Sequence, residues 1–399
     1  MKKIISILTF AGLVLGVLLG LFFPQFAASA EFIGIWYLKI LKAFIAPVIF
    51  TGISVTAYKT AGRKDRLVLK SVALFSAMFT ASFLIASALV LLIDPAKDFV
   101  FEQAGSTALA AGELFPGIEM LLRLFPVNLS DIFVSPKVFG IIVIAWVFGR
   151  AGSLIKKSGG VFSAMEKARD FFYKVLEYFM YLTPAAVFSL TASTVSRYGS
   201  ALLGAGLKYI GTAYACSLAV IALVMILPVR IFAGIGPLEY IRKVYRIWIM
   251  TMTTCSSAAT LPYTIRLCRD EFGIPGEVTD VVVPLGCTIH MCGGAVSFAL
   301  LGLFCTLGYG ISIGFGKYMM MLLAALLINM AAPGIPGGGI VIGASYLQLL
   351  GIPLGFMGFY AGIYKILDMV YTTLNVTGDI SANILLGKKN TSNDRRNER

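Results

Sequence analysis

Charged residues are scarce in this chain of 399 residues: only 13% are Asp, Glu, Lys or Arg, whereas a soluble domain has about one quarter. Hydrophobic residues make up 58% of the chain. Crossing a bilayer takes about 20 apolar residues, and apolar segments of about that scale lie at 4–23, 36–57, 71–93, 138–149, 175–195, 201–228, 281–305, 317–332 and 356–386. These segments are continuous and do not alternate, which argues against membrane strands. The sequence therefore predicts an all-α, polytopic membrane protein.

Histidine is nearly absent. The single histidine, His290, lies in the segment GCTIHMCGGAV between Cys287 and Cys292. On a continuous helix Cys287 would neighbour His290, but Cys292 would lie about 200° away around the axis. Because a structural zinc site needs four converging ligands, no transition metal is expected, and the cysteines are interpreted as small apolar residues. A membrane-embedded enzyme is disfavoured because the histidine has no evident Ser or Asp partner in the sequence.

Acidic residues are outnumbered, with 33 Lys and Arg against 20 Asp and Glu. The basic residues cluster in 59–70, 150–169, 230–246 and 388–399, whereas the acids gather in 94–119. By the positive-inside rule, this pattern predicts a multi-pass protein of the cell (inner) membrane with both termini in the cytoplasm. The lipid bilayer is thus the expected surrounding, and a nucleic acid is not an expected partner. The apolar run Ile4–Phe23 exceeds the 7–15 residues of a leader's apolar core, so we expect a spanning helix there.

Two segments near the end of the chain share one design. Both IWIMTMTTCSSAATLPYTIRLCRDEFGIPG and LLINMAAPGIPGGGIVIGASYLQLLGIPLG have two apolar arms around a tip of small, hydroxyl or Pro/Gly residues. Each ends in Gly-Ile-Pro and leads into a long helix with polar residues inside it. Non-helical backbone at membrane depth is tolerated only where it is buried in protein or lines a watery cavity. The pair therefore predicts two re-entrant hairpins beside a binding site near the midplane.

The last apolar helix, YKILDMVYTTLNVTGDISANILLG, carries a polar face. At about 100° per residue, Asn375 and Asp379 each lie about 20° from Asp368 around the axis, and Thr372 lies about 40° away. Carboxylates inside a membrane helix are costly and usually face a cavity or a partner. One carboxylate suits an ammonium group, and an amide can donate to a carboxylate. The face therefore predicts a site for a small zwitterion, and Asp379 suits a monovalent cation.

These residues resemble the dicarboxylate/amino acid:cation symporter family, which has the glutamate-transporter fold. The motifs that carry the resemblance are LKAFIAPVIFTGISV, TTCSSAATLP, TIHMCGG, PGIPGGG and DMVYTTLNVTGD. The resemblance implies eight transmembrane helices plus two re-entrant hairpins, built as inverted repeats, in a homotrimer whose transport domain moves as an elevator. Residues 1–229 would hold helices 1–6, with helices 1, 2, 4 and 5 as the trimerisation scaffold and helices 3 and 6 in the transport domain. Residues 230–387 would form the core transport domain (hairpin 1, helix 7, hairpin 2 and helix 8), and 388–399 a charged cytoplasmic tail.

The resemblance also implies roles for single residues. Asp368 would bind the amino group of the substrate, Asn375 its carboxylate, and Thr372 would line the pocket. Backbone contacts to the substrate would come from Ser257, Ile335 and Gly339. A sodium site would include Asp379 with the backbone near Gly286, His290 and Asn375, and part of a second would include Thr288 and Met291.

Departures from the family's pattern modify these expectations. Tyr371 stands where the family has an arginine that recognises an acidic side chain, and Gly294 replaces a threonine that assists it. Without that cation a second carboxylate would be desolvated unpaired, so we expect cation-coupled symport of a small neutral amino acid. An arginine of some members and its acidic partner are both replaced, by Cys255 and Tyr364.

The ion-binding positions depart as well. His290 and Cys292 replace an asparagine and an aspartate of the family. Asn329 and Ala332 stand at the positions of the second hairpin that complete the second sodium site, and a hydroxyl of the family is lost there. Fewer sodium ions are therefore expected than is typical of the family. Three alternatives remain. The first has a proton on His290 as the coupling ion, because histidine titrates near neutral pH. The second has a dicarboxylate as substrate, if Lys365 sets the charge of the pocket, and the third is an amino acid receptor that does not transport.

Overall fold

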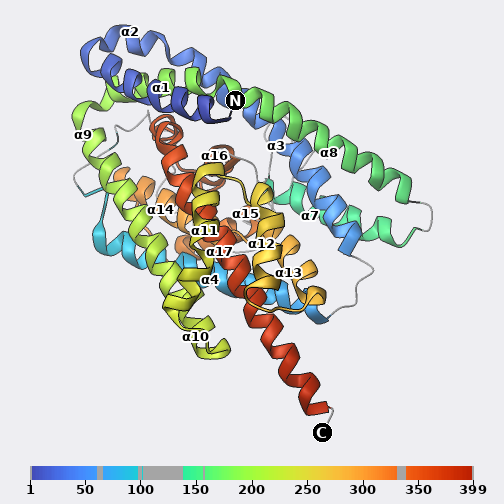
Figure 1. Ribbon diagram of the computed structural model, residues 1–399. Helices are drawn as coiled ribbons and strands as arrows, with labels where there is room; N and C mark the ends of the chain where they lie inside the picture. Colours follow the sequence, from blue (N-terminus) through green and yellow to red (C-terminus); the bar gives the residue numbers. More distant parts are fainter. Residues whose placement is uncertain are drawn as a thin grey trace.

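The structure is a computed structural model that describes residues 2–60, 66–97, 101, 138–155, 158–329 and 338–397. Every regular element among them is a helix (Figure 1), so the prediction of an all-α protein is confirmed. Ile335, Ala332 and most of the acidic segment 94–119 lie outside the described residues. The first helices are α1 (Lys2–Phe22), α2 (Pro24–Ser29), α3 (Glu31–Thr60), α4 (Arg66–Ile93), α7 (Val138–Ser153), α8 (Gly159–Phe179) and α9 (Thr183–Val220). The later ones are α10 (Leu227–Ala233), α11 (Pro237–Thr254), α12 (Ser257–Asp270), α13 (Gly276–Ile289), α14 (Cys292–Gly308), α15 (Phe315–Asn329), α16 (Gly338–Leu349) and α17 (Met357–Asn397).

Three stretches of the described chain are long and apolar enough to cross a membrane: Arg66–Ile93, Leu203–Ala233 and Gly276–Gly308. In the last of these, 89% of the most apolar window is buried inside the protein, against 39% in each of the other two. The helix pair α13–α14 is therefore enclosed by other helices, while α4 and the second half of α9 keep one side outward. Gly199, with φ +62°, breaks α9 into two helices, between the predicted segments 175–195 and 201–228.

Two groups of helices lie side by side (Figure 1). In the first, α1 packs along α9, and α3 packs on α7, α8 and α9. In the second, α17 is central and contacts α9, α11, α13 and α14, while α4 packs on α14. The C-terminal part of α17 projects beyond this second group, and the helix continues through the predicted tail to Asn397.

The contact between α1 and α9 depends on three glycines one turn apart. A Cβ added at Gly12, Gly16 or Gly20 would lie 2.6, 2.7 or 2.7 Å from a backbone carbonyl oxygen of α9. Membrane helices approach this closely where small residues recur every four positions, because lipid offers no hydrophobic drive for association and van der Waals packing must supply it. The spacing of the glycines thus fixes which face of α1 meets α9.

Both predicted hairpins are present as helix pairs that pack on each other. In hairpin 1, α11 and α12 meet at Cys255, which has the left-handed conformation φ 48°, ψ 40°. Ser256 then caps α12, because its side chain accepts a hydrogen bond from the N–H of Ala259 at 3.3 Å. In hairpin 2, α15 packs against α16, and the tip between them, 330–337, lies outside the described residues.

A line of hydroxyls on α17 holds hairpin 1 in place. The indole N–H of Trp248 donates to Thr377 at 2.9 Å, and the hydroxyls of Thr251 and Thr373 lie 2.8 Å apart. One turn further along α17, the hydroxyl of Ser381 lies 2.7 Å from that of Tyr240. Because these positions on α17 are four residues apart, they share one face. Hairpin 1 is therefore attached to α17 by satisfied polar pairs.

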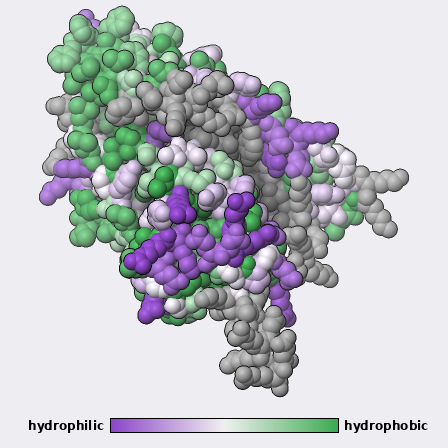
Figure 2. All heavy atoms as spheres, viewed as in Figure 1, coloured by the Kyte–Doolittle hydropathy of each residue, from purple (hydrophilic) through white to green (hydrophobic). Residues whose placement is uncertain are grey.

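The exposed side chains match a protein that crosses a membrane (Figure 2). Large apolar residues of α1 and α2 face outward, with Phe22, Phe23 and Phe26 between 65% and 70% exposed. Hydrophilic side chains instead gather over α11–α13, where the exposed charged residues are Glu239, Arg242, Arg246, Arg266, Arg269, Asp270, Glu271, Glu277 and Asp280. An apolar surface like that of α1 and α2 marks contact with lipid or another chain.

The glycine contact between α1 and α9 gives a stability prediction. In Gly16→Ala the new methyl group meets the backbone oxygen of Phe188, and overpacking of this kind costs about 1–3 kcal/mol. Gly211→Ala in α9 is the matched control, because nothing lies within 4 Å of its added Cβ and alanine favours a helix over glycine. We expect Gly16→Ala to lower the melting temperature of the purified protein and Gly211→Ala to leave it unchanged or higher. Equal shifts in the two variants would contradict the packing account.

Candidate functional site

The predicted polar face of α17 points into the protein. The spacing of Asp368, Thr372, Asn375 and Asp379 alternates between four and three residues, which places them on one side of the helix. Asp368 is 7% exposed and Asp379 2%. The hydroxyl of Thr372 donates to Oδ1 of Asp368 at 3.2 Å. The face therefore presents two buried carboxylates to the elements packed against it.

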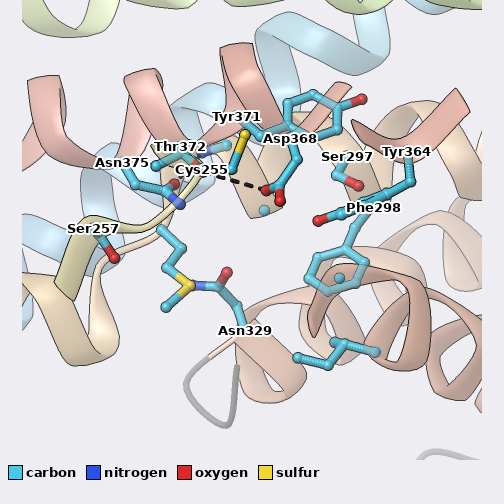
Figure 3. A pocket seen from close by; sticks show the side chains of 15 residues that line it. Cys255, Ser257, Ser297, Phe298, Asn329, Tyr364, Asp368, Tyr371, Thr372 and Asn375 are labelled. Carbon is cyan, nitrogen blue, oxygen red and sulfur yellow. Dashed lines mark hydrogen bonds between the residues drawn. The ribbon is translucent and has the colours of Figure 1, made fainter. Parts of the chain in front are cut away.

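A small cavity of about 60 Å³ lies against this face (Figure 3). Six residues predicted for substrate binding line it: Ser257, Gly339, Asp368, Tyr371, Thr372 and Asn375. The seventh, Ile335, lies outside the described residues. The sequence did not assign substrate contacts to the other lining residues, which are Cys255, Met291, Gly293, Gly294, Ser297, Phe298, Asn329, Ile342 and Tyr364. The cavity thus joins α17 to the tip of hairpin 1, the start of α14 and both arms of hairpin 2.

The orientation of the Asn375 amide follows from one hydrogen bond. The N–H of Gly293, in the first turn of α14, donates to Oδ1 of Asn375 at 2.8 Å. An N–H in the first turn of a helix has no acceptor within that helix, and the oxygen of Asn375 supplies one. The amide nitrogen of Asn375 is then left to donate, and in Figure 3 it faces the same space as the Asp368 carboxylate. Only glycine fits at 293, because a Cβ there would lie 2.2 Å from the carbonyl oxygen of Tyr371.

Two tyrosines of α17 face different ways. In Figure 3 the ring of Tyr371 points away from the carboxylate of Asp368, and Tyr360, Cys216 and Tyr214 are among its electrostatic neighbours. Tyr364 points into the cavity instead, and its hydroxyl packs so closely on Gly339 that an added Cβ would lie 1.8 Å from it. Tyr364 is therefore the tyrosine whose hydroxyl points into the cavity.

Helix 7 of the predicted fold is broken at His290 and Met291. Their backbone angles (φ −107°, ψ 97° and φ −126°, ψ 80°) separate α13 from α14. The expectation that Cys292 lies opposite His290 assumed a continuous helix and is wrong: Sγ of Cys292 lies 3.1 Å from Nε2 of His290. The sequence signals for a break lie near it but not in it: Pro284 is six residues before His290, and Gly293-Gly294 begins two residues after Met291.

His290 lies at the centre of a buried cluster with Asp379, Cys292 and Phe75, which we call the His290 cluster. Its Nδ1 lies 3.0 Å from Oδ1 of Asp379, and its ring stacks on Phe75 with centroids 4.4 Å apart and planes 11° apart. If Nδ1–H donates to the carboxylate, Nε2 is left to accept from the thiol of Cys292. The histidine therefore does have an acid and a nucleophile beside it, contrary to the sequence analysis. Hydrolases use this order of groups, but all three are at most 2% exposed and none lines the cavity.

The residues predicted for sodium are brought together only in part. Gly286 packs directly on Asp379, where an added Cβ would lie 2.3 Å from Oδ1. Met291 lines the cavity. Thr288 is exposed, and its hydroxyl donates back to the carbonyl of Leu285 at 2.7 Å. In the described part of the chain, no group of three His, Cys, Asp or Glu side chains converges as metal ligands do.

Paired hairpins, a broken helix and a polar cavity between them define a helical membrane transporter. A family model, that of the sodium:dicarboxylate symporter family, matches residues 5–389. Because this match covers nearly the whole chain, the protein belongs to that family, and the predicted resemblance is confirmed. Members of the family are symporters, so the protein is a transporter and not an enzyme.

Curated relatives are similar along most of their length. The proton/glutamate-aspartate symporter of Bacillus subtilis is 24% identical over 97% of this chain and 95% of its own. The proton/sodium-glutamate symport protein of Bacillus caldotenax is 26% identical over 95% and 93%. The C4-dicarboxylate transport protein of Xanthomonas campestris pv. campestris is 25% identical over 96% and 87%. These relatives support cation-coupled transport as the general function of the chain.

The His290 cluster gives a prediction about coupling between its members. His290→Ala leaves a buried carboxylate without its partner, which costs about 1–3 kcal/mol or more, and Asp379→Ala strands the imidazole. We expect the stability lost in the double variant to be smaller than the sum of the losses in the two single variants, by about 0.5–3 kcal/mol. Reversible unfolding in mixed micelles measures the free energy of unfolding of the wild type, of each single variant and of the double variant.

The control cycle pairs His290→Ala with Tyr346→Phe in α16, whose hydroxyl donates to the carbonyl of Met321 instead. That cycle is expected to be additive. Additivity in the first cycle would show that the contact between His290 and Asp379 contributes no coupling energy.

Proposed function

We propose that this protein is a secondary active transporter that carries a small neutral amino acid across the cell (inner) membrane together with a cation. The observation that carries the proposal is the pairing of an acceptor and a donor in one cavity. The Asp368 carboxylate faces the same space as the amide nitrogen of Asn375 (Figure 3). An ammonium group suits the first and a carboxylate suits the second, as charge-assisted hydrogen bonds require.

A neutral side chain on the substrate is supported by the rest of the lining. No lysine or arginine is among the described residues that line the cavity, so a second carboxylate would be buried without a countercharge. Lys365, the cation on which the dicarboxylate alternative depends, does not itself line the cavity; it hydrogen-bonds the thiol of Cys255, which does. The volume of about 60 Å³ accepts about four to six water-sized groups, which suits a small amino acid.

Two coupling cations are compatible with the ion-binding strip. The first is a sodium ion held by Asp379, Gly286 and Asn375, with Thr288 and Met291 as parts of a second site. The second is a proton held at His290. The contact of 3.0 Å between His290 and Asp379 favours the proton, because the ring takes up a carboxylate oxygen that sodium would need. The other titratable groups facing this pair are Cys292 of α14, Cys287 of α13 and Cys268 of α12.

The proposed movement is an elevator within a homotrimer. Residues 1–229 would supply helices 1–6, of which helices 1, 2, 4 and 5 form the scaffold, and the core transport domain 230–387 would move with helices 3 and 6. The two groups of helices in Figure 1, one with α1, α3, α7, α8 and α9 and the other around α17, are compatible with this arrangement. Both termini would lie in the cytoplasm. A receptor that binds the amino acid without moving it is the alternative that a transport assay separates.

Transport in proteoliposomes tests the proposal. Neutral amino acids are offered under an imposed proton gradient and, separately, under an imposed sodium gradient. We expect the proton gradient to drive uptake and the sodium gradient to have little effect, because His290 occupies the carboxylate of Asp379. His290→Asn, which restores the amide of the family's pattern and frees Asp379, is expected to shift the dependence towards sodium.

Several results would contradict parts of this account. Sodium-driven uptake in the wild type that survives His290→Asn unchanged would overturn the preference for a proton. Binding of neutral amino acids without gradient-driven uptake would favour the receptor. Uptake of dicarboxylates alone would overturn the assignment of the substrate.

A further inference from the structure

One wall of the cavity carries a polar atom that the protein itself does not use. Asn329, the last residue of α15, lines the cavity and is 2% exposed, and its Oδ1 is buried without a hydrogen-bond partner. Leaving a buried amide oxygen unpaired costs about 1–3 kcal/mol, and such groups are uncommon enough in native structures to require an explanation. A bound molecule that donates to Asn329 would supply one.

The neighbouring backbone is shaped around this amide. A Cβ added at Gly294 would lie 2.2 Å from Oδ1 of Asn329. The side chain of Asn329 therefore occupies space that exists only because residue 294 is glycine. The position of the amide oxygen therefore depends on residue 294 being glycine.

The placement of Asn329 relative to α17 gives its role. Asp368 and Asn375 occupy one side of the cavity, and in Figure 3 the side-chain oxygen of Asn329 points into the same space from the opposite side. If the ammonium and carboxylate groups of an amino acid bind to α17, its side chain extends towards Asn329. Phe298 and Ile342 of the lining are apolar, and the Tyr364 hydroxyl packs on Gly339. Asn329 adds a polar atom that is buried and has no partner.

We propose that Asn329, positioned over Gly294, selects amino acids with a short hydroxyl-bearing side chain, such as serine and threonine, over their apolar counterparts. This inference rests on the proposed function. A hydroxyl satisfies the amide whichever way it is turned, because it both donates and accepts. Alanine, which has no such group, leaves the buried oxygen unpaired, and sites built to bind a substrate hydroxyl discriminate strongly against analogues that lack it.

Calorimetric titration of the purified full-length protein tests this inference with two matched ligand pairs: serine against alanine, and threonine against valine. We expect the hydroxyl-bearing member of each pair to bind about tenfold or more tightly. Asn329→Leu, which keeps the branching and the number of side-chain heavy atoms but has no polar group, is expected to bring both ratios close to one. Gly294→Ala displaces the amide and is expected to reduce the ratios as well, which keeps the test open if Asn329→Leu does not fold.

The control variant is Asn383→Leu. Asn383 also has a buried Oδ1 without a partner, but its amide nitrogen donates to Thr279 at 3.1 Å and it does not line the cavity. In Asn383→Leu the preference for serine over alanine, and for threonine over valine, should match that of the wild type. Equal binding of serine and alanine by the wild type, or a ratio that survives Asn329→Leu, overturns the role of Asn329 and leaves the proposed function standing. Failure of every neutral amino acid to bind overturns the proposed function itself.

Discussion

A break in a buried helix is the constraint on which the rest of this structure depends. Where α13 ends and α14 begins, backbone N–H groups lose their helical partners, and neither lipid nor bulk water is there to replace them. The N–H of Gly293 is satisfied by the side chain of Asn375 at 2.8 Å. The histidine at the break is satisfied by Asp379 and Cys292. The polar face of α17 is thus needed for folding before any ligand arrives.

The same contacts prepare the face for function. Because Gly293 engages the oxygen of Asn375, the nitrogen is left to donate into the cavity. Asp379 engages His290, while Asp368, about three turns away along α17, lines the cavity (Figure 3). The proposed substrate site and the proposed ion site therefore lie at two places along one helix. A transporter needs this arrangement if binding at one end is to depend on occupancy of the other.

The sequence predicted those features that follow from periodicity and from residues with restricted backbones. The polar face of α17 follows from helical geometry alone, and both hairpins follow from small, Pro and Gly residues inside apolar segments. The sequence did not reveal the break at His290, because no residue there forbids a helix. It also did not reveal that the ring of Tyr371 points away from Asp368, since side-chain direction depends on packing between helices distant in the chain. The sequence placed Asn329 among the ion-binding positions and did not reveal that it lines the cavity, for the same reason: its amide fits there only because Gly294, on another helix, makes room.

The central claim is that α17 holds both charges of a zwitterion, and analogues of one ligand test it most directly. Serine, ethanolamine (which lacks the carboxylate) and 3-hydroxypropionate (which lacks the ammonium group) are titrated into the purified wild-type protein. The account predicts that serine binds and that each analogue binds about tenfold or more weakly, because each leaves Asn375 or Asp368 without its counterpart. Binding of 3-hydroxypropionate or succinate as tight as that of serine would contradict it.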